Sequence, residues 1–241
     1  MAGNPASLPE HYETARSKAA RLHARLREEI LAGVLRPGDA LSENLLAEQT
    51  AISRTPVREV LHRLSAEGLL RVVPQIGSFV APINLAAVTD SQFVREALEC
   101  QAVRQAAAAI TRAQASRLGR QIEAQQARIA AGDTAGFFAL DEAMHRMILE
   151  IAGRATVWQV IAGVKAQLDR VRHLSLQDAT WPAMLLSQHQ EIAARLIARD
   201  AEGAAAAMAV HLRTVFAAIA RIAAAHADFF ETASPTTQET R

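Results

Sequence analysis

The sequence changes character at Pro82. Beyond this residue the chain is rich in alanine, its apolar residues recur at the spacing of a helix face, and no segment shows the pattern of a strand. Upstream, short helical patterns are followed by two apolar segments that flank a turn. A chain of 241 residues is long enough for two hydrophobic cores. The sequence therefore predicts two domains, the second built from helices alone.

The two predicted domains are flanked by polar ends. Both ends contain proline and lack periodic apolar residues, which is typical of loose tails. We expect a tail over residues 1–14, a first domain over 15–82, a linker over 83–89, a second domain over 90–228 and a tail over 229–241.

The first domain is predicted to combine helices with a hairpin. Leu22, Leu26 and Ile30 recur at helical spacing, and Gly33 ends that pattern. The later segment LLRVVPQIGSFVAP has apolar, partly β-branched residues on both sides of a turn, which predicts a β-hairpin. The expected elements are helices over residues 16–32, 42–48 and 53–66 and a hairpin around residues 74–77. This order is typical of a winged helix-turn-helix.

The second domain is predicted to be an antiparallel helical bundle with short loops, so that the fold class is mainly α. Residues that favour helix ends separate its helices: Thr111 and Asp133 as N-caps, Gly132 and Gly153 as C-terminal stops, and Pro182 in a first turn. The expected helices span residues 86–110, 112–131, 134–152, 155–177, 182–199 and 201–228.

Charge is distributed unevenly along the chain. The net charge of +1 alone gives no reason to expect a nucleic-acid partner, because affinity for DNA depends on cations that neutralise phosphates. Residues 83–241 contain sixteen residues of each sign, whereas residues 53–71 contain four arginines and two glutamates. A basic surface for DNA is therefore expected in the first domain.

The segment SRTPVREVL, residues 53–61, carries the strongest functional signal. Ser53 is placed to cap a helix and Pro56 to occupy its first turn. Arg54, Thr55 and Arg58 are then left at the exposed N-terminal end, by which a recognition helix enters the major groove. Arginine matches the paired acceptors of guanine. The alternative is an ordinary solvated helix face.

The sequence around this segment, LRPGDALSENLLAEQTAISRTPVREVLHRLSAEGLLRVVPQIGSFVAP, resembles the winged-helix domain of the GntR family of transcriptional regulators across residues 15–82. The resemblance implies that four residues contact double-stranded DNA and that Gly77, at the tip of the wing, lets the backbone approach the minor groove. The four are Ser53, Arg54, Thr55 and Arg58.

Two positions depart from the family pattern. Asn44 stands where some members carry an arginine, and Gln75-Ile76 replaces the more usual polar or basic wing tip. These departures concern the second helix and the wing, not the recognition helix. Because one short recognition helix buries too little surface for a stable specific complex, we expect a homodimer on a pseudo-palindromic operator.

Four potential metal ligands lie in the second domain. Asp141 and His145 are four residues apart, so both project from one face of a helix. His189 and His211 each share a stripe with apolar residues on two other helices. A single buried histidine is usually a core residue with hydrogen-bonded nitrogens, and the aspartate can pair with a nearby arginine. Three inward histidines together with an aspartate favour a cation.

The spacing of these four residues, on six alanine-rich helices, resembles the FCD effector domain of the FadR subfamily of GntR regulators over residues 90–228. Metal-binding members use one aspartate and three histidines at these relative positions, so the resemblance implies a metal site here. One carboxylate and three imidazoles suit zinc, nickel or a similar divalent transition metal, with positions left open for water or a ligand's carboxylate.

An organic-acid effector would need a cationic partner as well. Arg95, in the segment VREALE, stands where the subfamily usually has an arginine near the effector cavity, and Arg172 is a second candidate. The alternative for Arg95 is an exposed ion pair with Glu99, worth only a few tenths of a kcal/mol. We expect a small carboxylate effector.

Two other functions fit parts of the pattern. A metal site beside Glu142 is compatible with a hydrolase, but Glu142 directly follows Asp141 and so points about 100° away around the helix. A metal-stabilised structural adaptor is the other alternative. No uninterrupted apolar run approaches the ~20 residues of a membrane helix, and Cys100 alone cannot form an internal disulfide. We therefore expect a cytoplasmic regulator rather than an enzyme or a membrane protein.

Overall fold

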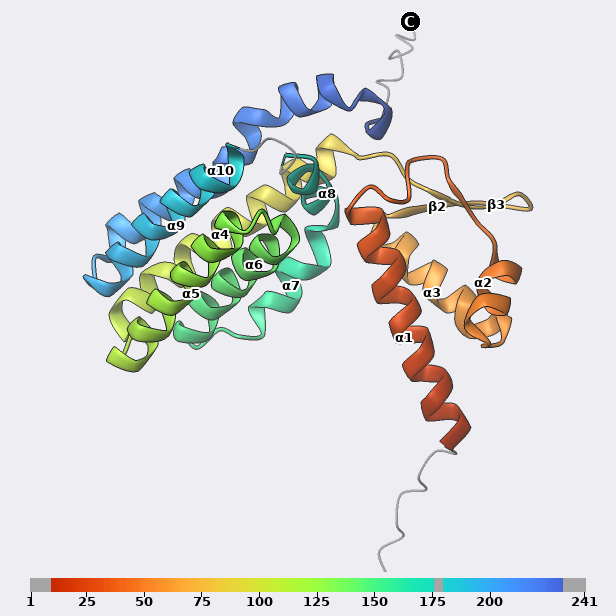
Figure 1. Ribbon diagram of the computed structural model, residues 1–241, viewed down its shortest axis with the longest axis horizontal. Coiled ribbons are helices and arrows are strands. Elements are labelled where there is room, and N and C mark those ends of the chain that lie inside the picture. The colour runs from red at the N-terminus through yellow and green to blue at the C-terminus, as the bar shows by residue number, and fades with distance from the viewer. Residues whose placement is uncertain (1–9, 176–179, 232–241) are drawn as a thin grey trace, which may run out of the picture. The chain divides into compact units, whose positions relative to one another are not determined.

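The computed structural model of the chain describes residues 10–175 and 180–231, which are mostly helical (Figure 1). The described residues divide into two compact units, one formed by residues 10–83 together with 228–231 and the other by residues 84–175 together with 180–227. The expected winged helix-turn-helix and the expected all-helical domain are both confirmed. Most of the two expected tails, residues 1–9 and 232–241, lies outside the described residues.

The N-terminal unit contains three helices and a small antiparallel sheet. Its elements are α1 (Glu10–Leu31), β1 (Ala40–Leu41), α2 (Glu43–Thr50), α3 (Arg54–Ala66), β2 (Leu70–Val73) and β3 (Gly77–Val80). The strand order is β1-β3-β2, with Leu70 opposite Val80 and Val73 opposite Gly77. Strand β1 has only two residues, too few to show a strand pattern in the sequence, and its Ala40 lies opposite Phe79. The hairpin of β2 and β3 is the predicted wing.

The core of this unit forms between α1 and α3. Leu22, Leu26 and Ile30 of α1 are buried, as is the stripe of Val57, Val60, Leu61 and Leu64 on α3. Ser53 occupies the N-cap position of α3, but its side chain makes no cap hydrogen bond, unlike Ser42, whose hydroxyl accepts from the Leu45 N–H at the start of α2. The buried stripe therefore fixes which face of α3 points outward.

The boundaries of this unit differ from those expected. Helix α1 begins at Glu10, inside the segment expected to be a tail. The expected linker over residues 83–89 is largely helix, because Asn84 caps α4 by accepting a hydrogen bond from the Ala87 N–H. The expected tail from residue 229 begins with two buried aromatic residues, Phe229 and Phe230, which belong to the N-terminal unit.

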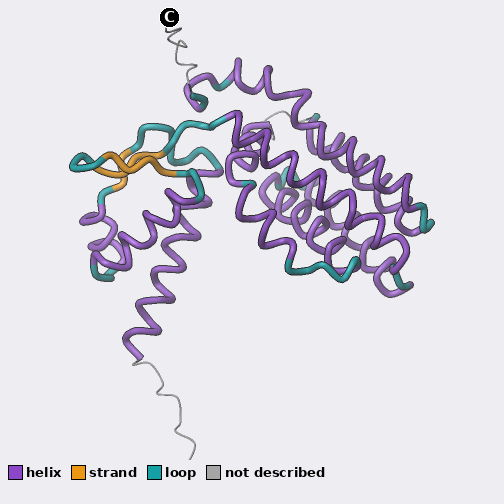
Figure 2. The backbone as a smooth tube through the Cα atoms, turned by 180° about the vertical axis from the view of Figure 1, so that it is seen from behind, coloured by secondary structure: helices purple, strands orange, loops and turns teal. Residues whose placement is uncertain are grey.

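The second unit is a bundle of helices that run alongside one another (Figure 2). Its elements are α4 (Leu85–Ala109), α5 (Arg112–Ala130), α6 (Thr134–Ile151), α7 (Val157–Val164), α8 (Ala166–Ser175), α9 (Trp181–Ile197), α10 (Ala201–Ala225) and the short 3-10 helix Ala227–Phe229, which continues into the first unit. The predicted caps are confirmed: Thr111 forms a capping box with Gln114, and Asp133 caps α6.

The predicted helix over residues 155–177 is wrong, because it is two helices that meet at Lys165. The backbone carbonyl of Val164 accepts a hydrogen bond from the Ser91 hydroxyl of α4, 2.5 Å away. A carbonyl engaged from another helix marks the place where α7 ends. Residues 176–177 of that prediction lie outside the described residues.

Helix α10 is by length and composition apolar enough to cross a membrane, with a mean hydropathy of 1.5 over an 18-residue window. It packs instead against α4 and α9, and Met208, Leu212 and Val215 are buried on its inner side. Such composition is shared by the core helices of helical bundles. We therefore assign α10 to the core of the second unit.

Candidate metal centre and DNA-binding helix

The four predicted metal ligands lie together in the interior of the helical unit. Asp141 and His145 come from α6, His189 from α9 and His211 from α10, and all four are buried. One ligand atom from each lies within 4.8 Å of the others. The Nε2 atom of His211 is 3.1 Å from that of His145 and 3.3 Å from that of His189. Two nitrogens bound tetrahedrally to zinc are about 3.3 Å apart, given Zn–N bonds of about 2.0 Å.

Hydrogen bonds around His211 determine which of its nitrogens carries the proton. The Thr214 hydroxyl donates to the carbonyl of Val210 and therefore accepts from the Gln188 amide nitrogen. The Gln188 oxygen, Oε1, then faces His211 Nδ1 at 3.1 Å and can only accept. The proton of neutral His211 is consequently on Nδ1, and its Nε2 presents a lone pair to the centre of the cluster.

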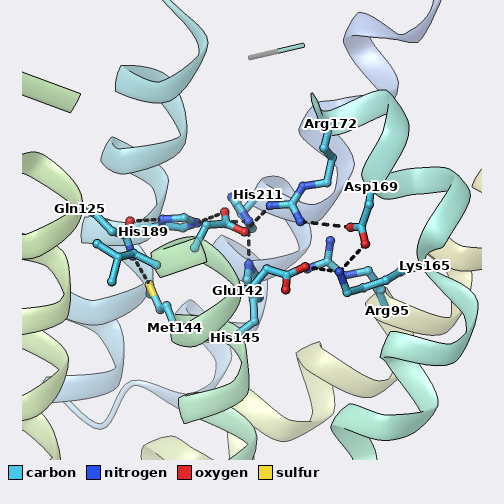
Figure 3. A network of polar contacts seen from close by, with 12 residues as sticks. Arg95, Gln125, Glu142, Met144, His145, Lys165, Asp169, Arg172, His189 and His211 are labelled. Carbon is cyan, nitrogen blue, oxygen red and sulfur yellow. Dashed lines mark hydrogen bonds and ion pairs between the residues drawn. The ribbon is translucent and has the colours of Figure 1, made fainter. Parts of the chain in front are cut away.

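His189 is oriented in the same way. The Gln125 amide nitrogen lies 3.7 Å from the Met144 sulfur, and Gln125 Oε1 lies 2.6 Å from His189 Nδ1 (Figure 3). The amide oxygen accepts the Nδ1 proton, which leaves Nε2 of His189 unprotonated in the neutral ring. Two imidazole lone pairs therefore face each other across 3.3 Å, an arrangement that a shared cation would stabilise.

The third imidazole has an anionic neighbour. Nδ1 of His145 lies 2.5 Å from Oε2 of Glu99, which also pairs with Arg95 at 2.6 Å. Burial opposes ionisation of Glu99, but Arg95 and His145 outweigh it and lower its pKa to about 2. Glu99 therefore stays a carboxylate next to Nδ1 of His145. A neutral His145 ring with its proton on Nδ1, facing this carboxylate, would present Nε2 to a metal.

Asp141 supplies the anionic oxygen of the cluster. Its Oδ1 is buried without a hydrogen-bond partner and lies 3.2 Å from Nε2 of His189, while Oδ2 pairs with Arg172. Burial opposes ionisation, but the Arg172 guanidinium outweighs it and holds the pKa of Asp141 well below its usual range. An orphaned carboxylate oxygen beside imidazole lone pairs fits a metal cation.

Protonation of the buried imidazoles is disfavoured. Burial lowers the pKa of His211 well below its usual range, and the neighbouring imidazoles of His189 and His145 add to the effect. Burial also lowers the pKa of His189, against the attraction of Asp141. At neutral pH both rings are therefore uncharged, which is the form that binds metal.

Both predicted effector residues lie next to the cluster. Arg95, Arg172 and His211 line a cavity of about 20 Å³ together with Trp181, Leu185, Leu212 and Val215. The ion pair of Arg95 with Glu99, which was the alternative for Arg95, is present. It is buried, however, with Arg95 only 3% accessible, so it is not the weak surface pair that was expected. The cavity as it stands holds about one water molecule, so a larger ligand would need lining side chains to move.

The predicted DNA-binding residues lie on the surface of the N-terminal unit. Ser53, Arg54, Thr55 and Arg58 are exposed at the start of α3, opposite its buried stripe. Gly77 is exposed at the end of the wing with a φ of +149°, a backbone conformation that L side chains rarely adopt. A hollow of about 290 Å³ lies between Arg54 and the wing residues Ile76 and Gly77.

Comparison with known proteins identifies the family. The model of the family described as bacterial regulatory proteins, gntR family, matches residues 18–80, and that of the FCD domain matches residues 90–214. The chain belongs to the GntR family. Both matched families are of transcriptional regulators, so the hydrolase alternative is set aside, and Glu142 pairs with Lys165 instead of facing the cluster.

Curated relatives are transcriptional regulators as well, and a solved structure shares the fold. A transcriptional regulator encoded in an unstable DNA locus of Streptomyces ambofaciens is 40% identical over 89% of this chain and 90% of its own length. The HTH-type transcriptional repressor RspR of Escherichia coli K12 is 34% identical over 87% of this chain and 92% of its own. Escherichia coli McbR/YncC has the same fold, with a TM-score of 0.72 at 22% identity over 85% of this chain and 97% of its own.

Four residues of these sites were missed from the sequence. Gln125 and Gln188 accept hydrogen bonds from Nδ1 of His189 and His211, and Glu99 lies 2.5 Å from Nδ1 of His145. Glu43, at the start of α2, binds Arg58 through two contacts of 3.0 and 3.1 Å and lies 3.5 Å from Arg54. Only Glu99 carried a signal, its spacing of four from Arg95, because the other partners are on different helices.

Proposed function

We propose that this GntR regulator binds a divalent transition metal at Asp141 and its three histidines and senses a small carboxylate there. The winged helix then binds double-stranded operator DNA as a homodimer in the cytoplasm, through the exposed residues at the start of α3 and Gly77 of the wing. The observation that carries the metal site is the set of inward-facing imidazole lone pairs beside the unpartnered Oδ1 of Asp141. Zinc and nickel suit this donor set.

The metal site is tested by elemental analysis of purified protein together with thermal unfolding in EDTA, zinc and nickel. Metal that binds the folded state alone raises the melting temperature with the logarithm of its free concentration. We expect this rise to disappear in His211→Ala and to persist in His173→Ala, which removes an imidazole of the same unit outside the cluster. Protein that contains no metal and melts at one temperature in all three solutions would refute the site.

The carboxylate effector is supported by the two buried arginines at the cavity beside His211. A carboxylate in this cavity would lie beside the guanidinium groups of Arg95 and Arg172 and beside His211, one of the residues that would hold the metal. A screen of small carboxylic acids by thermal shift on zinc-loaded protein is the test, with EDTA-treated protein as control. We expect binding only with metal. Metal that stabilises the bundle while no ligand changes DNA affinity would instead support a structural adaptor.

The homodimer is supported by the small size of the DNA-binding surface. Helix α3 has 13 residues, and its exposed end offers a few side chains to the major groove. Two copies related by a two-fold axis double that surface. Light scattering of the free protein and of its complex with a selected operator is the test, and a monomer in both would refute the proposal.

A further inference from the structure

The DNA-binding unit is completed by the C-terminal end of the described chain. The N–H of Ile83 donates to the carbonyl of Phe229 at 2.7 Å, and the N–H of Glu231 donates to the carbonyl of Ile83 at 3.1 Å. Ile83 and Phe230 thereby form a parallel bridge. Residues 228–231, which we call the C-terminal segment, thus lie against the last residue of the winged helix.

Side chains hold the C-terminal segment as well. Phe229 and Phe230 are 6% and 8% exposed, and Ile83 is fully buried. The Phe229 ring lies 3.1 Å from the position of a Cβ at Gly33, so a larger residue there would meet the ring. The Arg36 guanidinium lies 5.6 Å from the centre of the Phe229 ring and pairs with Asp228 at 3.6 Å. The turn after α1 is therefore shaped to receive this aromatic residue.

That turn leads directly to the wing. The N–H of Gly38 donates to the carbonyl of Val80, and the N–H of Val80 donates to the carbonyl of Asp39, each at 2.9 Å. Val80 is the last residue of β3, the strand that begins at Gly77. A continuous set of contacts therefore joins the C-terminal segment, through the turn of residues 33–39, to the strand that supports the wing.

The other end of the C-terminal segment is joined to the helix of the metal cluster. Helix α10 contains His211 and ends at Ala225, and Asp228 follows three residues later. A helix keeps its length under small loads, and two intervening residues allow little slack. The chain leaves the first unit after Ile83 and returns to it at Asp228. Each of these two connections is therefore next to the hydrogen bonds that join Ile83 to the C-terminal segment.

We propose that the C-terminal segment is a clasp that closes the DNA-binding unit and carries the state of α10 to the wing. This part of the inference rests on the proposed metal site, because binding at His211 is what would change α10. Order at the end of α10, in the turn of residues 33–39 and in β3 then rises and falls together. A regulator built in this way needs no separate contact surface to couple the two functions.

The clasp is tested by hydrogen exchange on the full chain and on Phe229→Ala, with Phe93→Ala as the matched control because Phe93 is 75% exposed in the helical unit. We expect Phe229→Ala to speed exchange of the Ile83 and Glu231 amides, and of the turn of residues 33–39, by roughly tenfold or more. The control should leave them unchanged. Unchanged exchange at these amides in Phe229→Ala would overturn the clasp.

A second measurement separates the clasp from the metal site. Zinc added to metal-free protein should slow exchange in the turn and in β3 of the natural chain but not in Phe229→Ala, while calorimetry finds zinc bound by both. If zinc binds both proteins and slows the turn equally, the coupling through the clasp is refuted. If calorimetry detects no zinc binding, the proposed metal site is refuted, and the coupling of α10 to the wing is refuted with it. Whether the C-terminal segment closes the DNA-binding unit is then decided by the exchange rates of Phe229→Ala alone.

Discussion

Charged residues are used differently in the two units of the molecule. In the DNA-binding unit, Arg58 and Glu43 pair on the surface, with the arginine side chain 55% exposed. In the helical unit, Arg172 and Asp141 pair in the interior, with side chains 9% and 0% exposed. A surface pair is weak and exchanges partners easily, whereas a buried charge that loses its partner is strongly destabilising. The first arrangement fits the proposed DNA contact, for which the arginines must leave Glu43, and the second fits the proposed metal site, whose residues must be held in place.

The largest expected effect comes from breaking the buried pair. Arg172→Met leaves the Asp141 carboxylate without its cation, and we expect metal-free protein to lose about 3–5 kcal/mol of unfolding free energy. The matched control is Arg104→Met, which breaks an exposed pair with Glu202 and should cost about 0–1 kcal/mol. Urea unfolding measures both.

Zinc provides a second test of the pair between Arg172 and Asp141. Because a metal bound at Oδ1 compensates the Asp141 charge, we expect the loss in Arg172→Met to be smaller when zinc is present. Equal losses with and without zinc would contradict a role for Asp141 as a metal ligand.

The stability of metal-free protein should depend on pH through the buried histidines. Burial lowers the pKa values of His189 and His211 in the folded state. Below about pH 6.5 these two histidines are therefore protonated more readily in the unfolded chain than in the folded chain. Unfolding free energy should therefore fall as pH decreases below about 6.5, by up to about 2.7 kcal/mol per pH unit for the two sites. Urea unfolding in EDTA between pH 7.5 and 5.5 is the measurement, and His189→Gln should reduce the slope.

Removal of the exposed arginines of α3 should weaken DNA binding without lowering the stability of the fold. We expect Arg54→Ala and Arg58→Ala each to lose about 1–3 kcal/mol of operator binding if they contact bases. Their melting temperatures should stay close to that of the natural chain, because both side chains are exposed. Fluorescence anisotropy with selected operator DNA measures the loss, and two variants that bind like the natural chain would assign recognition to another element.

The smallest effect is expected for Glu43→Gln. Removing this carboxylate frees Arg58 and Arg54 from their ion pairs and removes a negative charge that would face phosphates. Binding to random-sequence DNA should become tighter and more dependent on salt, while the unfolding free energy changes by less than about 1 kcal/mol. Weaker binding to random DNA would show that Glu43 acts mainly by positioning Arg58.

Local chemistry made much of the fold predictable. Thr111 and Asp133 were recognised as helix caps because capping depends on residues only three positions apart. The break at Lys165 was missed because it accompanies a hydrogen bond between Ser91 and the carbonyl of Val164, which are 73 residues apart in the sequence. The burial of Phe229 was missed for the same reason, since its partners Gly33 and Arg36 are at the other end of the chain.

The candidate site, like the fold, was only partly predictable from the sequence. Asp141 and His145 are related by helix geometry, and the apolar stripes around His189 and His211 indicated that both point inward. The resemblance to the FCD domain then joined the four residues into one expected site. Residues that orient those ligands carry no local pattern: a glutamine such as Gln125 on α5 looks like any polar helix residue until α9 is packed beside it. Arg172 was recognised as a cation near the effector but not as the partner of Asp141.

The burial of Phe229 and Phe230 also has a consequence for synthesis of the chain. The ribosome makes the winged helix first, but the residues that complete its core near Gly33 and Ile83 emerge only after the entire sensing unit. An incomplete nascent chain therefore lacks part of its DNA-binding domain. If the C-terminal segment closes the N-terminal unit as proposed, premature termination anywhere before residue 229 would yield a product whose winged helix is less stable.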